Sequence, residues 1–220
     1  MNDYLQKISI AIQKGKVDIN SAYPPDMKGE PGSHELTREA LNNGIAANDI
    51  LTQAMIPAMG IVGELFKNKK LFVPQVLMSA RAMNSAMVHL KPYFTSGEIK
   101  QRGTFVIGTV AGDLHDIGKN LVAMMVEGSG WKVVDLGVDV KTEKFIEAVT
   151  ENPGCILGMS ALLTTTMESM EKSVKDLRNL FPSQKILVGG APLNKEFAQR
   201  IGADLYAPNP QAAVEYINAI

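Results

Sequence analysis

Apolar residues in the first 93 positions recur at steps of three and four, which places them along one face of a helix. This spacing predicts about four helices packed as a bundle, near residues 2–15, 34–43, 50–65 and 74–90. Asp49 is predicted as the N-cap of the third helix, and Pro57 inside that helix should kink it. Residues 18–33 contain three prolines and two glycines and are predicted as a loop.

The pattern changes after residue 93. Residues 94–103 are mostly polar, contain two glycines and are predicted as a linker. Apolar runs of strand length follow at 104–110, 131–136, 155–160 and 185–188, with a weaker one at 204–207, and helical segments lie near 117–128, 142–150, 166–180, 194–201 and 210–219. Strands that alternate with helices favour βαβ units. The chain is therefore predicted to be an α/β protein: a four-helix bundle at 1–93, then a flavodoxin-like, doubly wound domain with a five-stranded parallel sheet at 104–220.

Composition excludes several classes of function. The net charge of the 220 residues is −1, so charge gives no reason to expect a nucleic-acid or membrane-surface partner. We identify no apolar run near the roughly 20 residues of a membrane helix, and the start, MNDYLQKISI, does not resemble a secretory signal. A single cysteine excludes an internal disulfide, and one cysteine with three histidines argues against a Cys/His zinc site. We expect a cytoplasmic protein.

Candidate chemistry gathers where the predicted strands end. Asp113 and His115 follow the first strand, at the sheet edge where α/β proteins bind ligands. A carboxylate two residues before an imidazole can fix its tautomer and make its other nitrogen a better metal ligand. Hydroxyl side chains from Ser160 to Thr166 follow the third strand, and Gly189-Gly190-Ala191 follows the fourth. Small residues there would let a ligand approach the backbone.

Each feature also has a purely structural interpretation. A single histidine in a loop is most often solvated, Asp113 could simply cap a helix, and paired glycines often form a turn. A phosphate-binding loop is rejected, because five residues separate Gly112 from Gly118 and Asn120 follows the lysine. The dinucleotide-binding glycine pattern is absent, and a phosphorelay receiver would need an aspartate where Ser160 stands.

Three motifs in combination are more specific than any one of them. They occur in order at spacings of 41 and 26 residues: Asp113-x-His115-x-x-Gly118, Ser160-x-Leu162 and Gly189-Gly190. This combination resembles the signature of cobalamin-binding modules, as in cobalamin-dependent methionine synthase and the small corrinoid proteins of methyltransferase systems. The helical half is similar to the cap of those modules at Leu65-Phe66, Phe72-Val73-Pro74-Gln75 and residues 79–83.

The resemblance implies a cofactor, cobalamin (as methylcobalamin or cob(I)alamin) or a related corrinoid, and a role for each matching residue. His115 would be the lower ligand of cobalt, Asp113 would hydrogen-bond it, and Thr166 stands where methionine synthase extends this relay with serine. Phe66 and Val73 of the cap would shield the methyl group. No catalytic residue is predicted. The implied cofactor-binding set is Gly112, Asp113, Leu114, His115, Asp116, Ile117, Gly118, Ser160, Leu162, Thr164, Thr166, Gly189, Gly190, Ala191, Phe66 and Val73.

The same resemblance implies a methyl carrier of anaerobic one-carbon metabolism. Its expected partners are a substrate:corrinoid methyltransferase of O-demethylase, methanol, methylamine or betaine type, an acceptor methyltransferase using tetrahydrofolate or coenzyme M, and a reductive activase. The chain is too short to contain those enzymes, so we expect no complete active site. The alternative is an adenosylcobalamin-binding regulatory or sensor module, although the basic stretch of a DNA-binding partner domain is missing. A mutase subunit would lack this cap.

Overall fold

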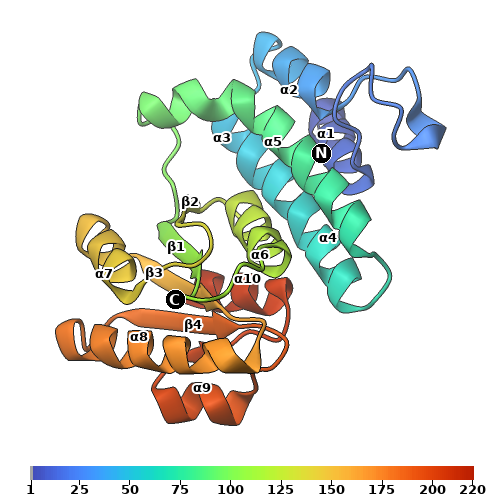
Figure 1. The fold of residues 1–220 in the computed structure, drawn as a ribbon. Helices are drawn as coiled ribbons and strands as arrows, with labels where there is room; N and C mark the ends of the chain where they lie inside the picture. Colours follow the sequence, from blue (N-terminus) through green and yellow to red (C-terminus); the bar gives the residue numbers. More distant parts are fainter. Residues whose placement is uncertain (1) are drawn as a thin grey trace. The chain divides into compact units, whose positions relative to one another are not determined.

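The computed structural model describes residues 2–220 and divides them into two compact units (Figure 1). The helical unit contains residues 2–101 together with 128–130, and the α/β unit contains residues 102–127 and 131–220. The segment between the last helix of the first unit and the first strand of the second runs from residue 96 to residue 103.

The helical unit is built from amphipathic helices around a common core. Its elements are α1 (Asp3–Lys14), η1 (Pro25–Met27), α2 (Ser33–Asn42), α3 (Ala47–Asp49), η2 (Ile50–Met55), α4 (Ile56–Lys67) and α5 (Val73–Thr95). Apolar side chains spaced three and four apart, such as Ile8 and Ile12 on α1, are fully buried. The helical character predicted from their spacing is confirmed.

The third predicted helix begins earlier than expected, and it continues through its proline; that Pro57 kinks it stays a prediction. Asp49 is not an N-cap: it lies inside a helical segment that begins at Ala47. Pro57 does not break that segment, which passes through the π-helical turn η2 immediately before it. The backbone N–H of Ile56 donates to the oxygen of Leu51, five residues back. A proline removes one i→i−4 bond, and a wider turn next to it lets the ladder change register.

The helical stretch Ala47–Lys67 is long and apolar enough, by length and composition alone, to cross a membrane, which the sequence interpretation overlooked. Its 21 residues have a mean hydropathy of 1.2 in the most apolar window, and 44% of that window is buried. The buried residues include Ile50, Met55 and Val62, which are completely enclosed within the protein. We attribute the apolar composition of this stretch to its place in the core of the helical unit.

The α/β unit contains one parallel sheet of five strands in the order β2-β1-β3-β4-β5. The strands are β1 (Thr104–Thr109), β2 (Lys132–Asp135), β3 (Ile156–Ser160), β4 (Lys185–Gly189) and β5 (Leu205–Tyr206). The helices between and after them are α6 (Ile117–Gly128), α7 (Thr142–Glu151), η3 (Thr164–Thr166), α8 (Met167–Leu180), α9 (Lys195–Ile201) and α10 (Pro210–Ala219). The predicted flavodoxin-like α/β fold is confirmed.

Both faces of this sheet are covered, which explains why its strands read as continuous apolar runs. One face carries Val106, Leu157 and Ile186, which belong to a buried cluster with side chains of α7, α8 and α9. The alternate residues Phe105, Ile107 and Leu187 lie on the other face, where α6 and α10 contribute the opposite wall of a cavity. The strands all end at the same edge, so the loops that follow β1, β3 and β4 meet there.

Candidate functional site

The loop after β1 carries His115 and is held by bonds within its own sequence. The Thr109 hydroxyl donates to the backbone oxygen of His115 over 2.9 Å, and the backbone N–H of Asp113 donates to the backbone oxygen of Val110 over 3.1 Å. Gly112 adopts a φ of 82°, a conformation that glycine reaches without strain. The local sequence therefore fixes the turn that carries Asp113 and His115.

A second loop braces the first. The backbone N–H of Gly112 donates to the Asp139 carboxylate over 2.7 Å, and the Asp139 N–H donates to the backbone oxygen of Asp113 over 3.0 Å. Asp139 itself has a φ of 53°, which is uncommon for a residue with a side chain. Sequence reasoning missed Asp139, because its contacts with residues 112 and 113 depend on the pairing of β1 with β2.

Asp113 is completely buried and accepts five hydrogen bonds. Its Oδ1 accepts from the backbone N–H of His115 over 3.1 Å and lies 2.8 Å from Nδ1 of the His115 ring. Its Oδ2 accepts from the backbone N–H groups of Leu162 and Leu163 over 2.6 and 3.3 Å. The Thr166 hydroxyl donates to the same oxygen over 2.8 Å. One carboxylate thus joins the loop after β1 to the loop after β3.

These donors determine the charge of Asp113. Burial by itself would raise the pKa of this carboxyl group, but the N–H groups of Leu162 and His115, the imidazole and the Thr166 hydroxyl outweigh it. Together they hold the pKa of Asp113 well below its ordinary value, so the group is a carboxylate at neutral pH. A carboxylate has no proton to donate, so the hydrogen of the His115–Asp113 bond belongs to Nδ1.

This bond defines what His115 can do. With the hydrogen on Nδ1, the other ring nitrogen, Nε2, carries a free lone pair in the neutral imidazole. The His115 side chain is 52% exposed, whereas its carboxylate partner is 0% exposed. The arrangement presents an oriented nitrogen ligand at the carboxyl edge of the sheet, held from behind by a buried anion. Such a pair is suited to ligating a metal ion.

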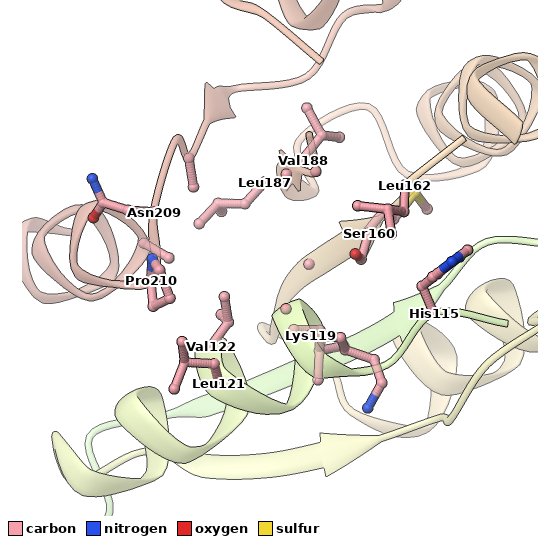
Figure 2. A pocket seen from close by; sticks show the side chains of 18 of the residues that line it. His115, Lys119, Leu121, Val122, Ser160, Leu162, Leu187, Val188, Asn209 and Pro210 are labelled. Carbon is pink, nitrogen blue, oxygen red and sulfur yellow. The ribbon is translucent and has the colours of Figure 1, made fainter. Parts of the chain in front are cut away.

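A cavity of about 750 Å³ begins beside His115 and extends along the sheet between β1, β3 and β4 and the helices α6 and α10. This volume lies within the range of about 300–1,000 Å³ that is usual for small-molecule sites. Figure 2 shows Ser160, at the end of β3, and Leu162, in the loop that follows, near His115, and Leu121 and Val122 of α6 facing Leu187 of β4. All of its lining residues belong to the α/β unit.

Glycines keep the backbone at the mouth of this cavity compact. A Cβ on Gly190 would lie 1.7 Å from the backbone oxygen of Ala161, so no other residue fits there without moving the chain. The Ala161 N–H in turn donates to the Gly189 oxygen over 3.1 Å, which fixes the loops after β3 and β4 side by side. A Cβ on Gly118 would meet nothing within 4 Å, so this glycine leaves space at the start of α6.

The structure brings most of the predicted site residues together. Those that line the cavity are Leu114, His115, Asp116, Ile117, Gly118, Ser160, Leu162, Gly189, Gly190 and Ala191. Gly112, Asp113 and Thr166 lie behind His115 and hold it, through the bonds described above. Thr164 is exposed in η3 and is not among the residues that line the cavity.

Phe66 and Val73 belong to the helical unit, where both side chains are half-buried. Phe66 lies in the last turn of α4 and Val73 is the first residue of α5. They therefore flank the same short loop, residues 68–72.

Several residues of the cavity wall escaped sequence reasoning. They are Phe105, Ile107, Lys119, Leu121, Val122, Gly158, Met159, Leu187, Val188, Tyr206, Ala207, Pro208, Asn209, Pro210 and Ala213. Most are apolar, and their sequence pattern is that of any buried strand or helix. One signal was available: Asn209-Pro210 is an N-cap followed by a proline at the first helical position, which marks the start of α10.

Comparison with known proteins identifies the same regions. A family model described as "B12 binding domain" matches residues 103–215, and a second model with this description matches residues 30–91. The chain is 39% identical over 191 residues to a corrinoid protein of Desulfitobacterium hafniense, covering 84% of this chain and 88% of that protein. It is 40% identical over 190 residues to trimethylamine corrinoid protein 1 of Methanosarcina acetivorans, again covering 84% and 88%.

A solved structure is similar over the whole chain. It is the methanol:cobalamin methyltransferase complex of Methanosarcina barkeri, with a TM-score of 0.83 and 29% sequence identity. The match covers 99% of this chain and 79% of the chain in that complex.

Proposed function

This chain belongs to the corrinoid proteins, the B12-binding methyl carriers of methyltransferase systems, and we propose that it moves a methyl group between two separate methyltransferases. One partner would take the methyl group from a small substrate and place it on the bound corrinoid. The second would remove it to tetrahydrofolate or coenzyme M. In this proposal residues 1–93 form the cap, 94–103 the linker and 104–220 the cobalamin-binding domain of a cytoplasmic carrier.

The observation that carries the proposal is the buried Asp113 beneath the exposed His115 ring. A corrin supplies four nitrogen ligands of cobalt, so a protein needs to add only one, and His115 presents one lone pair. When bound, the corrinoid supplies the cobalt that accepts and releases the methyl group. The residues present therefore fit the cofactor: His115 would ligate the cobalt, and Asp113 and Thr166 would hold the ring in one tautomer and orientation.

The cavity fits the part of a corrinoid that must leave the cobalt when His115 takes its place. We propose that the nucleotide tail enters between Ser160 and Leu162 on one side and Gly189 and Gly190 on the other. Gly190 lets the chain after β4 pack directly against Ala161, because a Cβ on this glycine would overlap the Ala161 oxygen, and both glycines line the cavity. Leu114 and Asp116 would contact the corrin from the loop of His115, Ile117 and Gly118 from the start of α6, and Ala191 from the loop after β4.

The helical unit is proposed to cover the bound corrinoid. Phe66 and Val73, at the two ends of the loop 68–72, are proposed to shield the methyl group on the upper face of the corrin. Such a shield has to move aside whenever a partner enzyme reaches the methyl group.

Partner enzymes, rather than this chain, are proposed to recognise the methyl donor. The relatives carry names that refer to trimethylamine and to methanol. We propose that this chain serves a substrate:corrinoid methyltransferase of the methylamine, methanol, O-demethylase or betaine type. We also propose that it depends on a reductive activase, because reduced cobalt is readily oxidised.

An absorption experiment tests the proposal. The full chain is loaded with cobalamin, reduced and treated with methyl iodide; we expect a histidine-ligated spectrum that changes on methylation and reverts when a partner enzyme removes the methyl group. His115→Ala should still bind cobalamin but lack the histidine-ligated spectrum and transfer methyl groups at least ten times more slowly, a loss at the lower end of the ~10–100-fold range for altered metal environments.

His34→Ala, a change in the helical unit, is the matched control and should behave as the natural chain does. A histidine-ligated spectrum in His115→Ala would overturn the assignment of the ligand. Binding of adenosylcobalamin without any methylation by methyl iodide would instead favour a regulatory module.

A further inference from the structure

The end of the cavity away from His115 has almost entirely apolar walls. The floor is formed by Phe105 and Ile107 of β1 and by Leu187 of β4, and the roof by Leu121 and Val122 of α6. A Cβ added to Gly158 of β3 would lie 2.6 Å from the Phe105 ring, so the aromatic ring covers this glycine directly. Pro210 and Ala213 complete the wall from α10.

The polar side chains of the lining are engaged elsewhere. The Lys119 amine donates to Asp135 over 2.5 Å and to Asn120 over 2.6 Å, and Figure 2 shows it turned away from the centre of the cavity. The Asn209 side-chain oxygen accepts from the N–H of Ala212 over 2.9 Å, as the N-cap of α10.

Two more polar residues of the lining do not reach the apolar end. Asp116 accepts from Asn120 over 3.0 Å and lies at the mouth, in the loop of His115. The Tyr206 ring packs against the buried cluster on the opposite face of the sheet. Ser160, also at the mouth, is the side chain whose oxygen Figure 2 shows pointing into the cavity. The far end therefore offers a flat aromatic ring little except apolar contact.

Resting on the proposed function, we propose that these walls select the corrinoid by the polarity of its lower base. The cavity accepts a benzimidazole or phenolic base and discriminates against adenine. Adenine carries an exocyclic amine and several ring nitrogens, which lose their water when buried and find no partner among Phe105, Val122 and Leu187. A buried polar group without a partner is costly, whereas the methyl-substituted ring of dimethylbenzimidazole gains from the same contacts.

Binding measurements with three cofactors test this selection. The full chain, free of corrinoid, is titrated by equilibrium dialysis with cobalamin, with its adenine-containing analogue and with a phenol-containing analogue, and Kd is measured for each. We expect the adenine analogue to bind at least tenfold more weakly than the other two, which corresponds to about 1.4 kcal/mol.

A substitution of nearly equal volume tests whether the apolar lining of the cavity produces the discrimination against adenine. Val122→Thr adds one hydroxyl to the roof of the cavity opposite Leu187, and should reduce the discrimination against adenine at least threefold. Val214→Thr is the matched control: Val214 is buried on α10 next to Ala213 but does not line the cavity, so the discrimination should be unchanged. Circular dichroism and Trp131 fluorescence confirm that both variants are folded.

The outcomes separate this inference from the proposed function. If none of the three corrinoids binds, the proposed function fails. If all three bind with equal affinity, the proposed function stands and base selection is overturned. If the discrimination exists but Val122→Thr leaves it unchanged, these walls do not produce it, and the inference is again overturned.

Discussion

Nδ1 of His115 lies 2.8 Å from Oδ1 of Asp113, yet the two side chains differ completely in exposure: 52% for the histidine and 0% for the aspartate. The carboxylate is shielded from water and receives four further hydrogen bonds from the protein, two of them from the loop after β3. The exposed imidazole is therefore oriented by a buried network. A change in that network should affect both the stability of the α/β unit and the behaviour of the ring.

Asp113→Asn replaces the buried carboxylate with an amide of nearly the same shape. An amide has one acceptor oxygen, so its NH₂ group would face the N–H groups of Leu162 and Leu163 or the imidazole N–H. The buried donors left without an acceptor should lower the free energy of unfolding by about 1–3 kcal/mol. Urea unfolding followed by the fluorescence of Trp131, the only tryptophan, measures this. Asp116→Asn, an exposed change in the same loop, should stay within about 0.5 kcal/mol of the natural chain.

The natural chain and Asp113→Asn can also be compared at different pH values, which tests the charge of Asp113. The pKa of Asp113 is lower in the folded protein than in the unfolded chain, where it is about 3.9. Its contribution is therefore fully present above the unfolded pKa and is lost as the pH falls toward the lower folded value. The stability gap between the natural chain and Asp113→Asn should be largest at pH 6 and shrink toward pH 3. A gap that does not change with pH would contradict the charged state of Asp113.

The sequence predicted the part of this site that depends on local pattern. The apolar run Thr104–Thr109 predicts a buried strand. Asp113 and His115 are two residues apart in the loop that follows, so the contact between their side chains depends on that loop alone. Thr166 could be linked to Asp113 only through the family resemblance, because it lies 53 positions further along the chain. The distance between two loops is set by strand order, and strand order is not encoded in the pattern of any one strand.

The residues that escaped prediction depend on longer-range geometry. Asp139 meets Gly112 because β2 pairs with β1, and Lys119 of α6 meets Asp135 at the end of β2. The error at Asp49 has a similar cause: an aspartate before an apolar stripe is a common N-cap, but here packing extends the helix back to Ala47. Local propensity was overridden by tertiary structure.

Thr166 provides a test of whether a threonine hydroxyl completes the relay. Its one hydrogen can serve either Asp113 at 2.8 Å or the backbone oxygen of Leu163 at 2.9 Å, and the carboxylate forms the stronger bond. Thr166→Val keeps the volume but removes the donor, and should cost about 1.5–3 kcal/mol, typical of a bond to a charged group. Thr166→Ser keeps the donor and should cost no more than about 0.8 kcal/mol for one buried methyl group.

The corrinoid-loaded forms of these variants extend the test of Thr166. Loss of a donor raises the pKa of Asp113, so in Thr166→Val the histidine ligand should detach at a higher pH during acidification, as followed by the absorption spectrum. Thr166→Ser should detach at the same pH as the natural chain. Identical curves for all three proteins would show that the hydroxyl has no influence on His115.

Two glycines should respond in opposite ways to alanine. Gly190 has a φ of 142°, and its added Cβ would overlap the Ala161 oxygen, so Gly190→Ala should lower stability by about 2 kcal/mol or more. Gly118 lies in α6, and a Cβ added to it would point into open space, so Gly118→Ala should raise stability by up to about 1 kcal/mol. The new methyl group would nevertheless protrude at the mouth of the cavity. Cobalamin should then bind more weakly to a more stable protein, and unchanged affinity would contradict the proposed position of the corrin.

Lys119 and Asp135 form an ion pair whose two ends have different surroundings. The Lys119 side chain is 2% exposed and that of Asp135 is 39% exposed. Asp135→Asn would leave a buried ammonium without its counter-charge and should cost about 3–5 kcal/mol. Lys119→Met leaves a carboxylate that water can reach, so its cost should be clearly smaller. Lys144→Met, which breaks an exposed pair with Glu147, should leave the urea midpoint unchanged. Equal losses of unfolding free energy for Asp135→Asn and Lys119→Met would mean that the Lys119 ammonium is not confined to the interior. The first turn of α6, next to His115, would then be held less firmly than its contacts indicate.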